Sequence, residues 1–142
     1  MESAFWDTSA LVPLCVSQQA TAAASQLARE QEMVVWWATP VEARSAFARL
    51  ARMQNLTASE FMQAQTRLER LRRAWREIQP TDALRAIAES LLDRYQLCAA
   101  DSLQLAAACT WALNRPRDRR FISADRQLLE AARQTGFRAI EL

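Results

Sequence analysis

The sequence contains no histidine and no lysine, and these two absences limit the chemistry that the protein can perform. All 18 of its basic residues are arginine. Catalysis by Ser-His-Asp or Cys-His groups, zinc sites with histidine ligands and histidine general bases are therefore excluded. The Walker A lysine and lysine Schiff bases are excluded for the same reason. Any hydrolysis by this chain must depend on carboxylates, with or without a metal ion.

Glycine and cysteine are also scarce. The single glycine, Gly136, argues against Gly-rich phosphate-binding loops. The three cysteines, Cys15, Cys98 and Cys109, are odd in number, have apolar sequence neighbours and show no CxxC spacing. A disulfide framework or a zinc site is therefore not expected, and we predict that all three are buried free thiols.

Length and hydropathy predict one domain over residues 1–142. A chain of 142 residues with 51% hydrophobic content can bury one core, and it is short for two. The longest apolar run near its start covers residues 10–16 and contains Pro13, so it fits neither a signal peptide nor a spanning helix. We therefore expect a cytoplasmic protein without a membrane partner.

The formal net charge is only +2, but arginines gather in the stretches 67–76 and 115–120. Guanidinium groups bind phosphate in a bidentate fork, so both stretches suit a polyanion such as RNA. A solvated helix face and an exposed loop would explain the same clusters equally well. The candidate RNA-binding residues are Arg67, Arg70, Arg73, Arg117 and Arg119.

Short strands alternate with amphipathic helices along the chain. Strands are predicted at residues 4–7, 33–37, 120–123 and 137–142. Helices are predicted at residues 17–30, from 39 onward, and at 57–78, 84–95, 101–113 and 125–135. Thr39 is expected to cap the second of these helices with Pro40 in its first turn, and Thr57 with Glu60 forms a capping-box pattern for the third.

This alternation predicts an α/β fold with a central parallel sheet of four or five short strands flanked by about seven helices. Strands that are separated by helical crossovers pair in parallel, and such sheets form their sites at the carboxyl ends of the strands. The segment 55–95 is expected to contain a pair of helices that forms a protruding arm, and any third central strand would be very short.

Four acidic residues fall at strand ends and helix starts. Asp7 ends the first predicted strand, Glu42 and Asp101 lie at the starts of helices, and Asp125 follows a later strand. Carboxylates at helix starts also act as simple caps, which is the alternative for Glu42 and Asp101. Independent caps would scatter over both edges of the sheet, whereas all four positions are expected at one edge.

Carboxylates that are crowded together repel one another, and a bound divalent cation relieves the repulsion. Mg²⁺ or Mn²⁺ suits a site made only of oxygen ligands. Such an ion can activate water for attack on a phosphodiester without any histidine. The sequence is therefore compatible with a nuclease.

Four segments of the chain resemble, in the right order, the four motif regions of PIN domains, and particularly of VapC-type toxins. These segments are FWDTSALVPL, TPVEARSAFARL, AADSLQLAAA and FISADRQLLEAARQTGF. The resemblance implies a PIN-like three-layer fold and Mg²⁺- or Mn²⁺-dependent endoribonuclease activity. It also implies a homodimer and inhibition by a cognate antitoxin, whose tail enters the active-site groove.

The resemblance assigns a role to each acidic residue. Asp7 and Asp101 would bind the metal ion, and Glu42 would bind it directly or through water. Asp125 would complete a second metal position or orient the attacking water.

Two serines also match the motifs. Ser9 and Ser123 stand where hydroxyl groups often support the acidic residues, although Ser9 could equally be a helix cap. For the tryptophans, among them Trp6, Trp36 and Trp37 in predicted strands, packing in the core or in a dimer is favoured over base stacking on RNA.

Two other functions are alternatives to the nuclease. A catalytically silent module could keep the fold and use its arginine patches to hold RNA or a partner protein. A receiver domain or an aspartyl phosphatase also places an aspartate at a strand end. The absence of lysine and of a DxD pair after the first strand disfavours this last alternative.

Overall fold

The computed structural model describes all 142 residues and contains one five-stranded sheet. All neighbouring strands pair in parallel, in the order β3-β2-β1-β4-β5. The strands are β1 (Glu2–Trp6), β2 (Gln31–Trp36), β3 (Arg76–Ile78), β4 (Arg120–Ser123) and β5 (Arg138–Glu141). The third strand has only three residues, as predicted.

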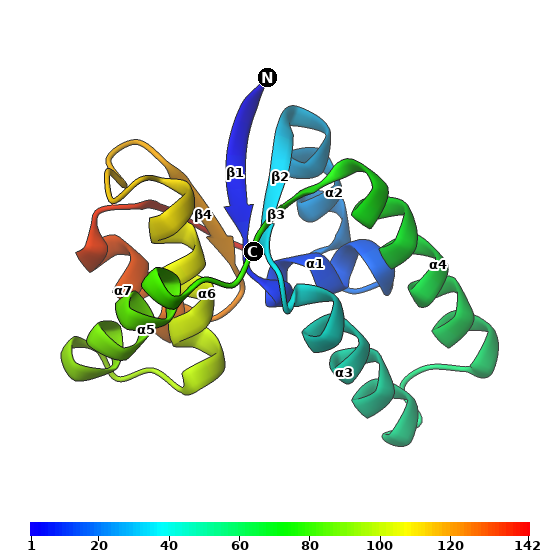
Figure 1. Ribbon diagram of the computed structural model, residues 1–142. Helices are drawn as coiled ribbons and strands as arrows, with labels where there is room; N and C mark the ends of the chain where they lie inside the picture. The colour runs from blue at the N-terminus through cyan, green and yellow to red at the C-terminus, as the bar shows by residue number, and fades with distance from the viewer.

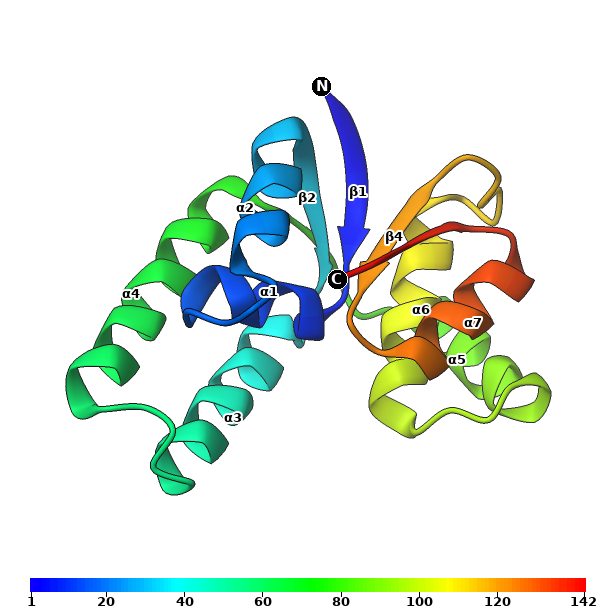
Figure 2. The same ribbon diagram turned by 180° about the vertical axis from the view of Figure 1, so that it is seen from behind.

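Seven helices cover the two faces of the sheet (Figures 1 and 2). One layer contains α1 to α4, and the opposite layer contains α5 to α7. The helices are α1 (Thr8–Cys15), α2 (Thr21–Glu30), α3 (Thr39–Arg52), α4 (Ala58–Ala74), α5 (Asp82–Arg94), α6 (Ala99–Trp111) and α7 (Arg126–Thr135). This arrangement confirms the predicted α/β fold of three layers.

The alternation of side chains along β1 joins both layers to the sheet. Phe5 packs into a cluster of 20 buried residues on the side of α5, α6 and α7. Ala4 and Trp6 point to the other face, where they pack with residues of α1 and α2. The two clusters bury β1 on both faces, as expected for the central strand of a parallel sheet.

A third apolar cluster joins α1, α3 and α4. Phe47 of α3 and Leu68 of α4 are fully buried in it. These helices form a lobe that extends beyond the sheet (Figure 1). The predicted arm over residues 55–95 is therefore wrong in its partners, because α4 packs against α3 whereas α5 packs against α6.

Several predicted boundaries differ from the structure by a few residues. β1 and β2 each begin two residues earlier than predicted and end one residue earlier. Helix α2 begins at Thr21 and not at residue 17, because the Thr21 hydroxyl accepts a hydrogen bond from the Gln18 amide and donates one to the Pro13 carbonyl. These bonds hold residues 17–20 outside the helix. Helix α1, which contains Pro13, lies outside the predicted helix ranges, and only the alternative of Ser9 as a helix cap implied a helix in this region.

Four residue assignments also need correction. Thr39 is the first residue of α3 and provides no cap, because the N-cap is Ala38. Ile78 lies in β3 and not on the preceding helix. Cys98 is an exposed thiol at the N-cap of α6. Trp37 follows β2 and is half exposed, so it is not a core residue.

None of the seven helices combines the length and the apolar character that crossing a bilayer requires.

The capping box of α4 allows a test of this part of the fold. The Thr57 hydroxyl accepts from the Glu60 amide at 3.1 Å, and the Glu60 carboxylate accepts from the Thr57 amide at 2.9 Å. Thr57→Ala should lower the free energy of unfolding by about 1 kcal/mol in urea titrations, because it leaves helix-start amides without an acceptor. Thr66→Ala, inside the same exposed helix surface, serves as the control. An equal effect of both substitutions would mean that the cap contributes nothing.

Candidate active site

The topology places a crevice at the carboxyl end of the central strand. From β1 the chain adds β2 and β3 on one side and then returns to place β4 on the other. Parallel sheets form binding crevices at such switch points, beyond the carboxyl ends of their strands. Asp7 follows β1 directly, and Ser123 ends β4 beside it.

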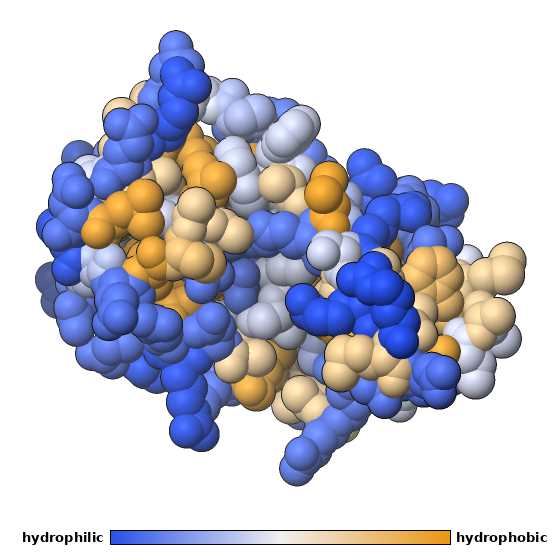
Figure 3. Space-filling view, turned by 90° about the horizontal axis from the view of Figure 1, so that it is seen from below, coloured by the Kyte–Doolittle hydropathy of each residue, from blue (hydrophilic) through white to orange (hydrophobic).

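A cleft of about 490 Å³ lies at this end of the sheet. Figure 3 looks onto this face from below and shows a hollow between the two lobes. All four predicted acidic residues line the cleft. The full lining comprises Asp7, Thr8, Ser9, Val12, Val41, Glu42, Ser45, Ala46, Arg49, Asp101 and Asp125.

The chemistry of this cleft, and not its size, distinguishes it from the other hollows of the surface. A hollow of about 610 Å³ on α4 and another of about 380 Å³ between α5 and the end of α6 contain no carboxylate. The four acids come from four separate elements that are far apart in the sequence, so the fold alone brings them together.

Asp7 is buried, and two serine hydroxyls hold its side chain. Ser9 Oγ donates to Asp7 Oδ2 at 2.6 Å, and Ser123 Oγ donates to the same oxygen at 2.8 Å. The Ala124 amide in turn donates to Ser9 Oγ, and the Asp125 amide donates to Ser123 Oγ. No side chain occupies Asp7 Oδ1. Ser9 therefore orients a carboxylate, and its side chain does not cap α1.

Glu42 is held in the same one-sided way. Its Oε1 accepts from Thr8 Oγ1 at 2.8 Å and from Gln104 Nε2 at 2.7 Å. The Gln104 amide also lies 3.0 Å from Thr8 Oγ1 and 3.4 Å from Thr39 Oγ1. Gln104 is fully buried, so this network fixes the position of the Glu42 carboxylate and leaves its Oε2 without a partner.

The other two acids belong to helix starts on the opposite side of the cleft. Asp101 lies in the first turn of α6, two residues after its first residue. Asp125 is the N-cap of α7, and its Oδ1 accepts from the Leu128 amide at 3.0 Å. Asp125 therefore acts as a cap as well as lining the cleft, which leaves one of its oxygens free.

Burial and mutual repulsion make the acids of the cleft harder to ionise. Burial raises the pKa of Asp7, and the hydrogen bonds from Ser9 and Ser123 offset part of this rise. Burial raises the pKa of Glu42 as well, with a further contribution from the charge of Asp7. The pKa of Asp101 rises to about 6 through desolvation and repulsion by Asp7, Asp125 and Glu42. These couplings show that the four carboxylates interact electrostatically.

The cleft suits a hard divalent cation by its donor chemistry. No group of three or more histidine, cysteine, aspartate or glutamate side chains is arranged so that it could hold a metal ion. Mg²⁺ does not require such a cage, because it keeps several waters and is bound through one or two carboxylates. Asp7 Oδ1 and the Asp101 carboxylate offer oxygens of this kind. A cation there would also offset the repulsion that raises the pKa of Asp101.

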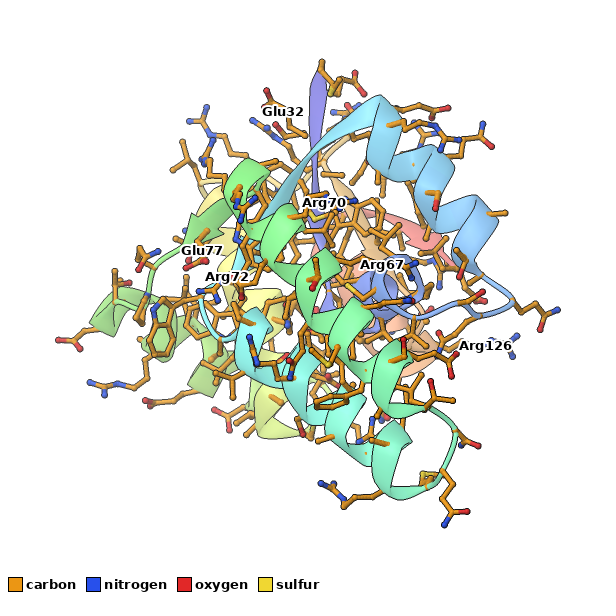
Figure 4. All side chains as sticks on the ribbon, turned by 90° about the vertical axis from the view of Figure 1, so that its right-hand side faces the viewer. Glu32, Arg67, Arg70, Arg72, Glu77 and Arg126 are labelled. Atoms are coloured by element: carbon orange, nitrogen blue, oxygen red, sulfur yellow. The ribbon has the colours of Figure 1, made fainter.

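The predicted RNA-binding arginines do not line this cleft. Arg67 and Arg70 lie on α4 in the outer lobe (Figure 4), as does Arg73, and Arg67 donates to the Cys15 carbonyl at 3.1 Å. Arg117 and Arg119 lie in the loop before β4, at the amino edge of the sheet. Whether these five residues contact RNA stays a prediction, and any such contact would lie outside the acidic cleft.

Sequence reasoning missed four residues of the site: Thr8, Ser45 and Arg49, which line the cleft, and Gln104, which is buried and supports Glu42 from the core. Helical spacing could have found three of them. Ser45 and Arg49 follow Glu42 by three and seven residues on α3, and Gln104 follows Asp101 by three residues on α6. Residues at these spacings share one face of a helix.

Comparisons with solved structures agree with this architecture. A toxin–antitoxin complex from Klebsiella pneumoniae contains a chain that is 18% identical, with a TM-score of 0.59 and 87% of each chain covered. PAE2754 from Pyrobaculum aerophilum is 18% identical with a TM-score of 0.64, over 97% of this chain and 89% of that one. FitAcB from Neisseria gonorrhoeae is 17% identical with a TM-score of 0.64, over 96% of both chains.

No protein-family model matches the sequence, and no curated protein matches it. At 17 to 18% identity the likeness to solved structures shows the fold alone. The fold class is the PIN-like one that the sequence predicts.

The raised pKa of Asp101 predicts how stability depends on pH without a divalent cation. Below pH 3.8 the carboxyl is protonated in both the folded and the unfolded state, so it costs nothing. Between pH 3.8 and about 6 the folded state binds more protons, so the free energy of unfolding falls as pH rises. Above that range the cost is constant.

Asp101→Asn should therefore stabilise the metal-free protein at pH 7 and leave its stability at pH 4 nearly unchanged. We expect a gain of about 1 kcal/mol, because partial exposure of Asp101 and the favourable charge at a helix start reduce the full effect of the shift. Chemical denaturation at both pH values in EDTA measures it, with the exposed Asp93→Asn of α5 as control. A loss of stability at pH 7 would contradict the repulsion.

Proposed function

We propose that the chain is a Mg²⁺- or Mn²⁺-dependent endoribonuclease that acts as the toxin of a toxin–antitoxin pair. The supporting observation is that Asp7, Glu42, Asp101 and Asp125 line one cleft and that repulsion among them raises the pKa of Asp101. Crowded carboxylates repel one another when they are ionised, and a bound divalent cation relieves this repulsion. The chain has no histidine and no lysine, so hydrolysis must depend on its carboxylates.

The proposed reaction is hydrolysis of an RNA phosphodiester. A bound Mg²⁺ or Mn²⁺ would polarise a phosphoryl oxygen and lower the pKa of a water, so that hydroxide could attack phosphorus. The P–O bond to the leaving nucleotide would break, and its oxygen would take up a proton. Asp7 and Asp101 would hold the ion. Asp7 is oriented for this role because Ser9 and Ser123 both donate to Oδ2, so that no side chain competes for Oδ1.

Glu42 and Asp125 would orient water at the site. Thr8 and Gln104 fix Glu42 through one carboxylate oxygen, which leaves Oε2 to accept a proton or a hydrogen bond from water. The raised pKa of Glu42 also suits it to hold a proton transiently. Asp125 is fixed as the N-cap of α7 by the Leu128 amide, so that its second oxygen is the one available.

The toxin role rests on a different kind of support. One of the solved structures with this fold is a toxin–antitoxin complex. The motif resemblance indicates the same role, together with a homodimer and an antitoxin whose tail would enter the cleft. A small neighbouring gene for a DNA-binding protein with a disordered acidic and hydrophobic tail would favour the pairing. Size-exclusion chromatography with light scattering tests the dimer.

A catalytically silent RNA- or protein-binding module remains the second candidate. The observation that favours it is the exposed row of arginines on α4, which lies outside the acidic cleft. Such a module would bind RNA in a salt-sensitive way, and substitutions of Asp7 or Asp101 would not affect its binding.

If the protein is a metal-dependent nuclease, the purified protein should cut RNA in the presence of Mg²⁺ or Mn²⁺, and EDTA should abolish the cleavage. Asp7→Asn and Asp101→Asn should each lower the rate by about a hundredfold or more, because each removes a ligand or its orientation. Asp93→Asn, an exposed acid on α5, should cut as the wild type does. Full activity in EDTA, or unchanged activity of both substituted proteins, would falsify the proposal.

Metal binding can be measured apart from activity. Mn²⁺ should raise the melting temperature of the wild-type protein, since a ligand that binds only the folded state stabilises it. The same addition of Mn²⁺ should raise the melting temperature of the Asp101→Asn protein much less. Equal shifts for the two proteins would place the ion elsewhere.

A further inference from the structure

Arg49 is the single basic residue among the eleven that line the acidic cleft. Its guanidinium is exposed and makes no hydrogen bond or ion pair with the protein. Another arginine of the same helix, Arg44, is by contrast paired with Glu69 of α4 at 3.5 Å. Arg49 therefore has five unpaired donors at the wall of a cleft whose other charged groups are all carboxylates.

The position of Arg49 along α3 relates it to the proposed reaction centre. Glu42 and Arg49 are seven residues apart, which corresponds to nearly two turns and an axial rise of about 10 Å. Both line the cleft, with Ser45 between them on the same face. The opposite face of α3 is anchored by Phe47, which is fully buried against α1 and α4. The separation of Glu42 and Arg49 is therefore set by a rigid helix.

The negative charge of the cleft favours a basic side chain such as Arg49 for binding an RNA substrate. Four carboxylates repel a polyanion, and a bound cation offsets this repulsion only near the phosphate that reacts. A guanidinium held away from that centre would attract a different phosphate of the same strand. Arginine is suited to this because its planar fork binds phosphate oxygens in pairs.

We propose that Arg49 binds a backbone phosphate of the RNA strand next to the one that is cut, so that the strand lies along α3. This rests on the proposed ribonuclease activity and adds the direction in which the substrate crosses the cleft. Because this phosphate does not change during the reaction, Arg49 contributes equally to the bound substrate and to the transition state. Its loss should therefore raise KM and leave kcat nearly unchanged.

The test compares Arg49→Gln, Arg49→Lys and Arg52→Gln with the wild type. Glutamine and lysine are good helix formers, so the exposed helix surface tolerates both changes. Arg52, the last residue of the same helix, is exposed, unpaired and outside the cleft, which makes it the matched control. Cleavage kinetics use the metal-loaded protein with a single-stranded RNA oligonucleotide. Binding is measured by fluorescence anisotropy in the Asp7→Asn background at several salt concentrations.

Arg49→Gln should raise KM by roughly tenfold, the effect of losing one hydrogen bond to a charged group, with kcat within about twofold of the wild type. The slope of log affinity against log salt should fall by about 0.7, the value for one phosphate contact on a single strand. Arg49→Lys should restore the slope but only part of the affinity. Arg52→Gln should change neither quantity.

Wild-type cleavage with an unchanged KM and salt slope for Arg49→Gln would overturn this inference and leave the ribonuclease intact. A fall in kcat alone would overturn it as well, because it would place Arg49 at the reacting phosphate. Unchanged RNA binding with weaker binding of polyglutamate would assign Arg49 to a protein carboxylate instead. A wild-type protein that neither binds nor cuts RNA would remove the proposed function and this inference together.

Discussion

Repulsion among carboxylates at the carboxyl end of the sheet is the constraint on which the site depends. The chain must hold Asp7 and Asp101 near each other although their charges oppose it. The buried clusters on both faces of β1 supply the energy for this, since Phe5, Trp6 and Phe121 are fully removed from water. The free energy of burial thus offsets the cost of keeping the charged site assembled, and such a cost is characteristic of functional sites.

The hydrogen bonds of the cleft follow one pattern. In Asp7 the donors gather on Oδ2, and in Glu42 they gather on Oε1. A carboxylate that is held through one oxygen keeps a fixed orientation while its other oxygen stays available. Gln104 extends the pattern into the core, where its amide reaches Thr8 and Glu42 together. The supporting residues therefore position the acids without satisfying them completely, as a binding site requires.

The sequence predicted the architecture because periodicity and strand order reflect it directly. It also predicted which acids would meet, since strand ends and helix starts of a parallel sheet converge at one edge. It failed where the deciding contacts join separate segments of the chain. The bond from Thr21 to the Pro13 carbonyl shortens α2, and the packing of Phe47 joins α3 to α4, and neither contact has a local signal. Arg49 had a local signal, because its seven-residue spacing from Glu42 places both on one face of α3, but its role depends on carboxylates that other elements bring to the cleft.

The arginines differ in whether they have partners within the protein. In the outer lobe Arg67 donates to a carbonyl, and at the amino edge Arg119 stacks on Trp111 at 5.3 Å, so these members of the clusters have structural partners. Arg49 has none within the protein, although it lines a cleft with four acids. An arginine keeps its charge at every physiological pH, even where neighbouring groups have shifted pKa values. In the proposed enzyme the cation would act at the phosphate that reacts, and Arg49 would act on the strand beyond it, so neither group could replace the other.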